Sequence, residues 1–196
     1  DEALPFIEGS FDLVISCLSL HFVNDLPGTL LQIRRILKPD GLFIAGVMGG
    51  ATLNELRLAW LLAEIESDKG VSPRVIPFSD VQDFGYLLQR AGFALPVVDV
   101  DTLKVSYNSA LTLMHDIRAM GAGNVLSERS RIPVSRHILQ RVQEIYLQQF
   151  ADKNGRVPAT FELIVMTGWS PHESQQKPLP PGTAKIRLSD ALKSQK

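Results

Sequence analysis

The feature that most constrains the fold is a strand, helix and strand pattern close to the beginning of the chain. An almost unbroken apolar run extends from Phe11 to Leu18 and contains β-branched residues, which indicates a strand covered on both faces. Apolar residues then recur at helical spacing from Leu26 to Leu37, with Asp25 placed to cap the helix. A second apolar run, Leu42 to Met48, follows a Pro and a Gly. Two strands joined by one short crossover helix pair in parallel, so the sequence predicts part of an α/β sheet.

Two later residue pairs match the capping box that marks a helix start. Thr52 is followed by Glu55, and Ser79 is followed by Gln82. In the capping box the first side chain accepts a hydrogen bond from the backbone N–H three residues on. The second side chain accepts a hydrogen bond from the backbone N–H of the first residue. Apolar residues at helical spacing come after each pair, so we predict two helices that begin at these positions.

The residue pattern in the second half of the chain predicts two strands with helices between them. Alternating apolar residues in 94–107 indicate a strand that bends or breaks near Asp101. Ser109 is placed to cap a short helix, and apolar residues in 138–146 indicate the longest amphipathic helix. Ala159 to Thr167 is rich in β-branched and aromatic residues and predicts the final strand. The helices in about 109–151 would then form an insertion before that strand.

Composition excludes several classes of protein. A chain of 196 residues with 45% hydrophobic content suits one globular domain, which we place at residues 1–169, followed by a polar, Pro-rich tail at 170–196. A net charge of -1 gives no electrostatic case for nucleic acid. No apolar run approaches the roughly 18 to 20 residues that span a bilayer. We therefore expect no nucleic-acid partner and no transmembrane segment, while peripheral membrane contact stays compatible with the sequence.

The residues do not predict a metal site. Cys17 is the only cysteine, and its place inside an apolar run indicates a buried core residue rather than a ligand. The four histidines, His21, His115, His137 and His172, are scattered along the chain without the spacing of a metal-binding motif. We therefore expect neither an internal disulfide nor a metal centre.

Several phrases resemble a known superfamily. FDLV at 11–14, LSLHFVND at 18–25 and ILKPDGLF at 36–43 resemble class I S-adenosylmethionine-dependent methyltransferases from their fourth strand through their fifth. GGATLNELR at 49–57 and VPATFELIVMTGW at 157–169 resemble one branch closely. That branch is the methyltransferase-like assembly factor 5 of respiratory complex I, described as an arginine hydroxylase, with its bacterial relatives. A weaker resemblance is to malonyl-acyl-carrier-protein O-methyltransferase of biotin synthesis, which shares an LHWVND-type turn.

The resemblance implies a Rossmann-like α/β fold that binds S-adenosylmethionine. The strand order of the full fold is 3-2-1-4-5-7-6, with the last strand antiparallel. This sequence would supply the C-terminal part, strands 4-5-7-6 with flanking helices, and would lack the N-terminal part that holds much of the cofactor. A sheet edge left at the first strand of this segment would be exposed and apolar.

The resemblance also implies positions for the cofactor and for a catalytic residue. In such enzymes an acidic residue before an LPF-type motif holds the adenine, and main-chain groups at the end of the fourth strand approach the methionine part. His21 follows in the same turn and is the candidate catalytic base, although a packed or capping histidine explains it equally well. The implied cofactor-binding residues are Asp1, Glu2, Ala3 and Leu4 for the adenine side and Ser16, Cys17, Leu18 and Ser19 for the methionine side.

Three functions follow from the resemblance. The first is a methyltransferase-like enzyme acting on a protein substrate in complex I assembly, such as an iron–sulfur subunit, by methyl transfer or by arginine hydroxylation. Methyl transfer needs mainly positioning, whereas hydroxylation needs an oxidising centre that these residues do not explain. The second is O-methylation of a small acyl substrate on an acyl carrier protein. The third is a non-catalytic assembly factor that docks a client protein. The compartment would be the mitochondrial matrix side in a eukaryote and the cytoplasm in a bacterium.

The stretch from Arg129 to Arg141 bears on the choice between these functions. Four arginines give it a local basic bias, and a helical insertion before the last strand is where class I enzymes commonly build a substrate cover. A client peptide would favour this surface, and a small acyl substrate would favour a narrow apolar lid. The ordinary alternative is a solvated helix face.

Overall fold

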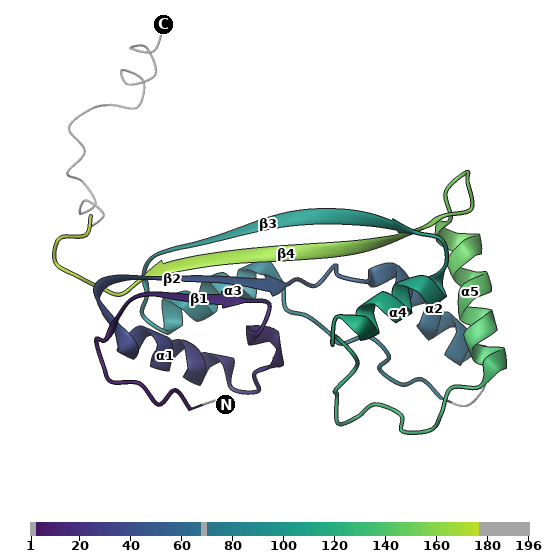
Figure 1. Ribbon diagram of the computed structural model, residues 1–196, viewed down its shortest axis with the longest axis horizontal. Helices are drawn as coiled ribbons and strands as arrows, with labels where there is room; N and C mark the ends of the chain where they lie inside the picture. Colours follow the sequence, from purple (N-terminus) through teal and green to yellow (C-terminus); the bar gives the residue numbers. More distant parts are fainter. Residues whose placement is uncertain (1–2, 68–69, 177–196) are drawn as a thin grey trace, which may run out of the picture.

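The computed structural model describes residues 3–67 and 70–176 and contains one four-stranded sheet in the order β1-β2-β4-β3 (Figure 1). The parallel pair is β1 with β2, and β4 runs antiparallel to both of its neighbours. This order and these directions match strands 4-5-7-6 of the methyltransferase fold, so the predicted fold class is confirmed. The strands are β1 (Phe11–Cys17), β2 (Leu37–Met48), β3 (Ala94–Tyr107) and β4 (Val157–Trp169).

The helices occupy one face of the sheet and one end of it (Figure 1). Helix α1 packs against β2 and helix α3 against β3 and β4, while α2, α4 and α5 gather beyond the end of β2. In the chain, α4 and α5 come between β3 and β4. The bounds are η1 (Leu20–Phe22), α1 (Leu26–Ile36), α2 (Asn54–Ile65), α3 (Val81–Arg90), α4 (Ala110–Ala119) and α5 (Arg136–Phe150).

Two hydrophobic cores share strand β4. The first core lies between the sheet and helices α1 and α3, and Ile164 and Met166 of β4 are fully buried in it. The second core lies between α2, α4 and α5 and the other end of β4, where Val157 and Ala159 are fully buried. Tyr146 of α5 fills the second core and donates a 2.7 Å hydrogen bond to the Pro158 carbonyl. The long antiparallel pair of β3 and β4 therefore joins the two halves of the molecule.

Local signals correctly predicted two helix starts. The Asp25 side chain accepts from the Gly28 N–H at 2.9 Å at the start of α1. The Ser109 side chain accepts from the Thr112 N–H at 3.2 Å at the start of α4. Both caps are contacts within one turn, so their residues need no distant partner.

Both capping-box predictions were wrong in detail. The N-cap of α2 is Leu53, in a left-handed conformation with a φ of 55° and no side-chain cap. Thr52 instead bonds to the backbone of Glu162 in β4, and Glu55 accepts hydrogen bonds from Thr160. Both side chains therefore form hydrogen bonds with β4 and do not cap the helix. The N-cap of α3 is Asp80, one residue after the predicted Ser79, because its carboxylate accepts from the first N–H groups of the helix.

The prediction that β1 is covered on both faces was also wrong. Helices α1 and α3 cover one face only (Figure 1). On the other face Leu13 and Ile15 are 45% and 59% exposed, because no described element packs there. Cys17 is exposed rather than a core residue, since β1 forms the edge of the sheet among the described residues.

Two further predictions concern β3 and the tail. The strand β3 continues through Asp101 without a break, and its irregularity lies between Ala94 and Val97, where Leu95 has a φ of 48°. Of the predicted tail, residues 177–196 lie outside the described part of the chain. Gln175 is described, and its amide donates to the Ser170 carbonyl at 2.8 Å and to Asp40 at 2.9 Å.

Candidate functional site

The turn that follows β1 organises the candidate site. Leu18 has a φ of 52° and donates its N–H to the Gly46 carbonyl of β2 at 2.9 Å. The hydroxyl of Ser19 lies 2.8 Å from that of Ser16, and the short helix η1 then carries His21. This turn stands at the C-terminal ends of two parallel strands, where open α/β sheets bind their ligands.

A hollow of about 690 Å³ lies on the β1 side of this turn. Three of the predicted cofactor-binding residues, Leu4, Ser16 and Ser19, line it together with apolar side chains of β1 and α1. Leu4 is held by a 2.8 Å hydrogen bond from its N–H to the Gln32 side chain. The hollow falls within the volume range of small-molecule sites.

The other predicted cofactor-binding residues are not gathered in that hollow. Ala3 and Cys17 are exposed and do not line it, and Leu18 faces the opposite side of the turn. Asp1 and Glu2 lie outside the described residues. The structure therefore brings together part of the predicted set, and of the adenine-side residues it describes Ala3 and Leu4 alone.

A second, more apolar cavity of about 760 Å³ lies on the other side of the turn. Its wall comes from the turn itself, the end of β2, helix α2, the paired strands β3 and β4, and helix α4. Phe22 lines both the hollow and this cavity, so the turn separates the two spaces. The apolar lining is Leu18, Phe22, Met48, Leu53, Leu56, Trp60, Val75, Ile76, Phe78, Leu103, Val105, Met114, Ile117, Met120, Ala122, Phe161 and Leu163.

Few polar side chains reach the cavity. They are those of His21, Thr52, Arg74, Tyr107, Arg118 and Asn124, and no Asp or Glu is among the described residues that line it. Thr52, Arg74 and Asn124 already bond to protein groups. The groups left to meet a ligand are therefore the imidazole, the phenol and one guanidinium.

His21 stands at the border between the turn and the cavity. Its ring centroid lies 4.2 Å from that of Phe22 and 5.9 Å from that of Phe78. Its Nδ1 is buried and finds no hydrogen-bond partner within residues 3–67 and 70–176. Burial lowers the pKa of His21 below its usual value, because desolvation disfavours the charged ring. The imidazole is therefore neutral at pH 7 and has a nitrogen able to accept a proton.

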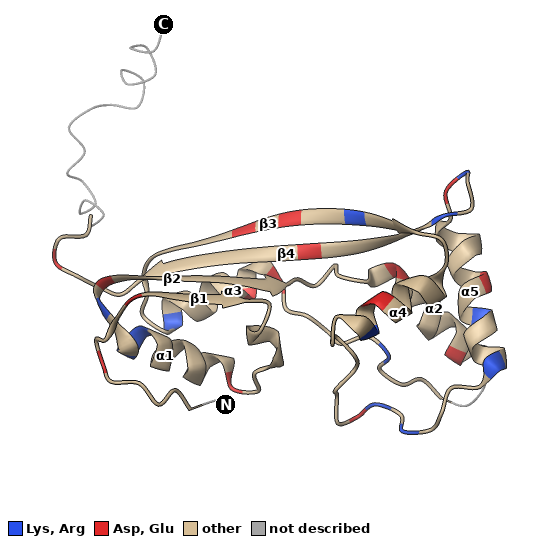
Figure 2. Ribbon diagram, viewed as in Figure 1, with Lys and Arg blue, Asp and Glu red and all other residues tan. Residues whose placement is uncertain are grey.

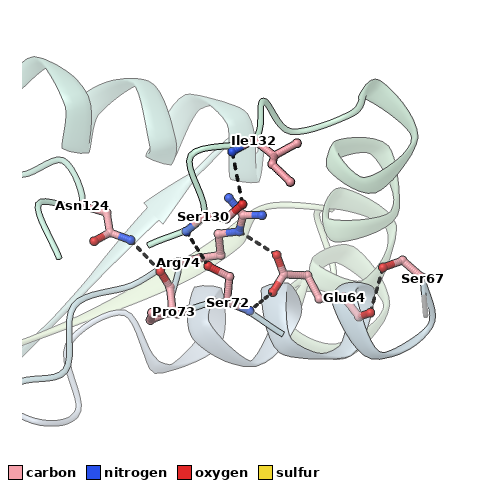
Figure 3. A network of polar contacts seen from close by, with 8 residues as sticks. All are labelled: Glu64, Ser67, Ser72, Pro73, Arg74, Asn124, Ser130 and Ile132. Atoms are coloured by element: carbon pink, nitrogen blue, oxygen red, sulfur yellow. Dashed lines mark hydrogen bonds and ion pairs between the residues drawn. The ribbon is translucent and has the colours of Figure 1, made fainter. Parts of the chain in front are cut away.

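A buried ion pair shapes the wall opposite the turn (Figure 3). The Glu64 side chain, only 4% exposed, accepts from Arg74 Nε at 2.6 Å and from the Ser72 N–H at 2.8 Å. The Arg74 guanidinium also lies 5.3 Å above the Trp60 ring. This arrangement holds the segment after α2 against the helix and neutralises one of the two arginines in the cavity.

The same network ties the segment between α4 and α5 to that wall (Figure 3). The Ser130 N–H donates to the Ser72 hydroxyl at 2.8 Å, and the Asn124 amide donates to the Pro73 carbonyl at 2.6 Å. Sequence reasoning missed this network. The available signal was Glu64, a carboxylate four residues after Trp60 and so on the same apolar helix face.

Within residues 3–67 and 70–176, no three His, Cys, Asp or Glu side chains are grouped so as to hold a metal ion. Over the same ranges, every helix is too short or too polar for a bilayer span.

Comparison of sequences confirms the resemblance to methyltransferases. The profile of a family described as "Methyltransferase domain" matches residues 1–45. The chain is 44% identical over 193 residues to the mitochondrial arginine-hydroxylase NDUFAF5 of Danio rerio, covering 98% of this chain and 60% of that protein. It is 44% identical over 190 residues to NDUFAF5 of Homo sapiens, covering 97% and 55%. It is also 36% identical over 186 residues to a malonyl-[acyl-carrier protein] O-methyltransferase of Halorhodospira halophila, covering 95% and 60%.

Comparison of structures shows the fold. A candidate methyltransferase of Bacillus halodurans superposes with a TM-score of 0.53 at 18% identity, covering 87% of this chain and 75% of that one. The YcgJ protein of Bacillus subtilis gives a TM-score of 0.53 at 15% identity, covering 87% and 68%. The chain thus carries the methyltransferase-type α/β fold from the fourth strand onward, and it spans just over half the length of the NDUFAF5 relatives.

The Glu64–Arg74 pair should be a strong determinant of stability. We expect Arg74→Met to lower the free energy of unfolding by about 3 kcal/mol, because it leaves a carboxylate buried without its counter-ion. Urea denaturation monitored by circular dichroism would measure the loss. Arg141→Met is the matched control, since Arg141 pairs with Glu66 in an exposed bridge, and its loss should be much smaller. Equal losses in the two variants would contradict the assignment.

The burial of His21 should appear in its titration. The folded protein disfavours the charged ring, so it binds fewer protons than the unfolded chain below the ordinary pKa of 6.5. We expect the His21 contribution to stability to be complete above pH 6.5 and to fall as pH drops through its lower folded pKa. Nuclear magnetic resonance of the His21 ring protons would give that midpoint. The difference in unfolding free energy between wild type and His21→Gln should change with pH in the same window; a midpoint at or above 6.5 would contradict this.

Proposed function

We propose that this chain forms the substrate side and part of the cofactor edge of an S-adenosylmethionine-dependent methyltransferase. The observation that carries the proposal is the pair of spaces that meet at the turn after β1, a hollow beside β1 and an apolar cavity beyond it. A donor placed in the hollow and an acceptor placed in the cavity would meet across Leu18 and Phe22. Class I methyl transfer requires such an in-line approach of two ligands.

The cofactor would lie along the β1 side of the turn. Leu4, Ser16 and Ser19 border the hollow there, and the main chain of Cys17 and Leu18 continues that edge. Asp1, Glu2 and Ala3 would lie toward the adenine. The hydroxyls of Ser16 and Ser19 can donate to a bound carboxylate or ribose oxygen. When bound, S-adenosylmethionine supplies an electrophilic methyl group on a sulfonium.

The chain's own residues would position the acceptor and keep water from it. The apolar side chains of the cavity exclude solvent, which strengthens the few polar contacts inside. His21 would act as the catalytic base where the acceptor carries a proton, because its ring is neutral and its Nδ1 is free of protein partners among the described residues. An acceptor that is already ionised would need no base.

For the biological role we propose action on a protein in respiratory complex I assembly, such as an iron–sulfur subunit. The 44% identity to NDUFAF5 proteins supports this role. Figure 2 shows basic residues and one acidic residue, Glu128, along the segment between α4 and α5. The same segment carries Arg129 and Arg131 and the exposed apolar residues Val125 and Ile132. Such a mixed surface suits a protein client and peripheral contact with an anionic membrane. The compartment would be the mitochondrial matrix side in a eukaryote and the cytoplasm in a bacterium.

One observation favours a second candidate, O-methylation of malonyl groups on an acyl carrier protein. The cavity is apolar and no carboxylate lines it among the described residues, which suits an acyl group better than the guanidinium of an arginine. The 36% identity to a malonyl-[acyl-carrier protein] O-methyltransferase points the same way. Arginine hydroxylation would need an oxidising centre to which the described residues contribute no evident ligands.

The position of the cofactor can be tested directly. In the full chain, we expect Ser19→Phe to weaken S-adenosylmethionine binding by at least tenfold, because the phenyl ring would occupy the hollow. Calorimetry would measure the affinity, and ultraviolet crosslinking of labelled cofactor should mark the peptide that contains residues 16–19. Ser127→Phe is the control, an exposed serine that lines neither space. Equal affinities in wild type and Ser19→Phe would refute this placement.

The substrate class can be tested by transfer of a labelled methyl group. With complex I subunits and malonyl-acyl-carrier protein offered separately, we expect label to appear on the protein subunits. Label on the malonyl group alone would establish the second candidate. Retention of a subunit in a pull-down, with no label on either substrate, would identify a non-catalytic assembly factor.

A further inference from the structure

Arg57, near the start of α2, links two backbone segments that are separate in the chain. It is the last residue of the phrase GGATLNELR at 49–57, and its guanidinium donates to the Gly50 carbonyl at 3.4 Å and to the Thr52 carbonyl at 3.3 Å. The same guanidinium donates to the Ile76 carbonyl at 3.4 Å. One side chain therefore joins the turn after β2 to the segment between α2 and α3.

The α2–α3 segment, residues 70–79, contains no helix or strand, so its backbone groups depend on partners from other elements. Its first half is held by the Glu64–Arg74 pair, and Asp80 caps the helix that follows it. Arg57 supplies a side-chain donor between these two anchors. Each Arg57 bond is long and weak by itself, but a planar guanidinium can serve carbonyls of two segments at once.

The α2–α3 segment runs close against the turn after β2. A Cβ added at Gly50 would lie 3.5 Å from the Phe78 carbonyl oxygen, an ordinary van der Waals distance, so the two backbones are neighbours. The Phe78 side chain lines the apolar cavity, and its ring stands edge-on to the His21 ring with the centroids 5.9 Å apart. The contact that Arg57 makes at Ile76 is thus two residues from the ring that packs on His21.

His21 depends on packing for its orientation. A catalytic base is commonly oriented by a hydrogen bond from a third group, yet the buried Nδ1 of His21 finds no such partner within residues 3–67 and 70–176. Two aromatic rings flank the imidazole. Phe22 is its neighbour in η1 and moves with it, so Phe78 is the ring that fixes His21 relative to another part of the molecule.

We propose that Arg57 is a positioning residue for His21, because it holds the α2–α3 segment against the turn after β2 and so keeps the Phe78 ring against the imidazole. The inference rests on the proposed function in treating His21 as the catalytic base. It deepens that function by naming a residue, outside both the hollow and the cavity, on which the geometry of the base depends.

Nuclear magnetic resonance of the full chain tests the contact. The readout is the intensity of nuclear Overhauser cross-peaks between the His21 and Phe78 rings, with the His21–Phe22 cross-peaks as internal reference for a folded turn. We expect Arg57→Gln to lower the relative intensity by about threefold or more, because the segment loses its donor. Arg57→Lys keeps the charge but lacks the planar fork, so it should lose about as much. Unchanged relative intensity in both variants would overturn the proposal.

Arg34→Gln is the matched control. Arg34 is also half-buried and also donates to a backbone carbonyl at 3.4 Å, that of Gly92 in the turn after α3. It lines neither the hollow nor the cavity, so we expect the His21–Phe78 cross-peaks to keep their relative intensity. A loss equal to that of Arg57→Gln would show a general loosening of the fold and would remove the assignment to Arg57.

The positioning role predicts a loss of rate rather than of cofactor binding. For an acceptor that carries a proton, single-turnover transfer of a labelled methyl group should slow about tenfold in Arg57→Gln, since a misplaced base loses part of its contribution. Phe78→Ala should slow transfer similarly. The double variant should be no slower than Phe78→Ala, because both changes act through the same ring; losses that multiply would contradict that shared route.

S-Adenosylmethionine affinity, measured by calorimetry in every variant, separates this inference from the proposed function. We expect Arg57→Gln to leave that affinity within about twofold of wild type. A protein that loses the His21–Phe78 cross-peaks in Arg57→Gln but binds no S-adenosylmethionine would refute the proposed function and leave the positioning contact standing. A protein that binds S-adenosylmethionine and keeps those cross-peaks in Arg57→Gln would refute the inference alone.

Discussion

The structure depends on the pairing of β4 with strands on both of its edges. Hydrogen bonds to β2 and β3 fix its register, and the register decides which residues meet at the cavity. Met48 lies opposite Leu163, and Leu103 lies opposite Phe161, so the floor of the cavity is set by backbone geometry. The same strand contributes fully buried residues to both hydrophobic cores. A shift of one residue would turn these side chains to the opposite face and disturb both cores together.

Two polar side chains at the start of α2, Thr52 just before the helix and Glu55 in its first turn, reinforce that register. Thr52 bonds to the backbone of Glu162, and Glu55 bonds to Thr160. These side chains are nearly buried, so their hydrogen bonds are made in a medium where leaving them unmade would be costly. They anchor the start of α2 to β4, and α2 in turn presents Trp60 to the cavity. The position of the cavity wall therefore follows from the sheet.

The charge of the cavity follows from which ions are paired. Glu64 and Arg74 are close enough, and buried enough, to act as a neutral unit toward anything that enters. Arg118 lacks such a partner among the described residues, and His21 is held neutral by burial. Among the described residues, the apolar cavity is bordered by the neutral His21 and Tyr107 and by Arg118, which has no ion-pair partner there, and this differs from a site built for a cationic side chain.

Sequence reasoning was correct where the determining contacts are local and failed where they are distant. Periodicity identified the strands and helices, and Asp25 and Ser109 cap their helices within one turn. The Thr52 and Glu55 pattern predicted a local cap, but residues more than a hundred positions away offered hydrogen bonds to the same side chains. Cys17 lies in an apolar strand that should bury it, yet its exposure depends on what covers β1. Of the predicted cofactor residues, Leu4, Ser16 and Ser19 line the hollow, whereas Leu18, in a left-handed conformation, lines the cavity on the other side of the turn.

The amino-acid sequence by itself determined the α/β class, the order of the elements and the resemblance to methyltransferases, because these follow from periodicity and from short motifs. Only the tertiary structure decided which side chains share the cavity, that Glu64 cancels the charge of Arg74, and that Arg118 has no such partner in the part of the chain that the structure describes. Pairing and burial depend on distances between segments far apart in the chain. No local pattern encodes those distances, whereas the folded sheet sets them directly.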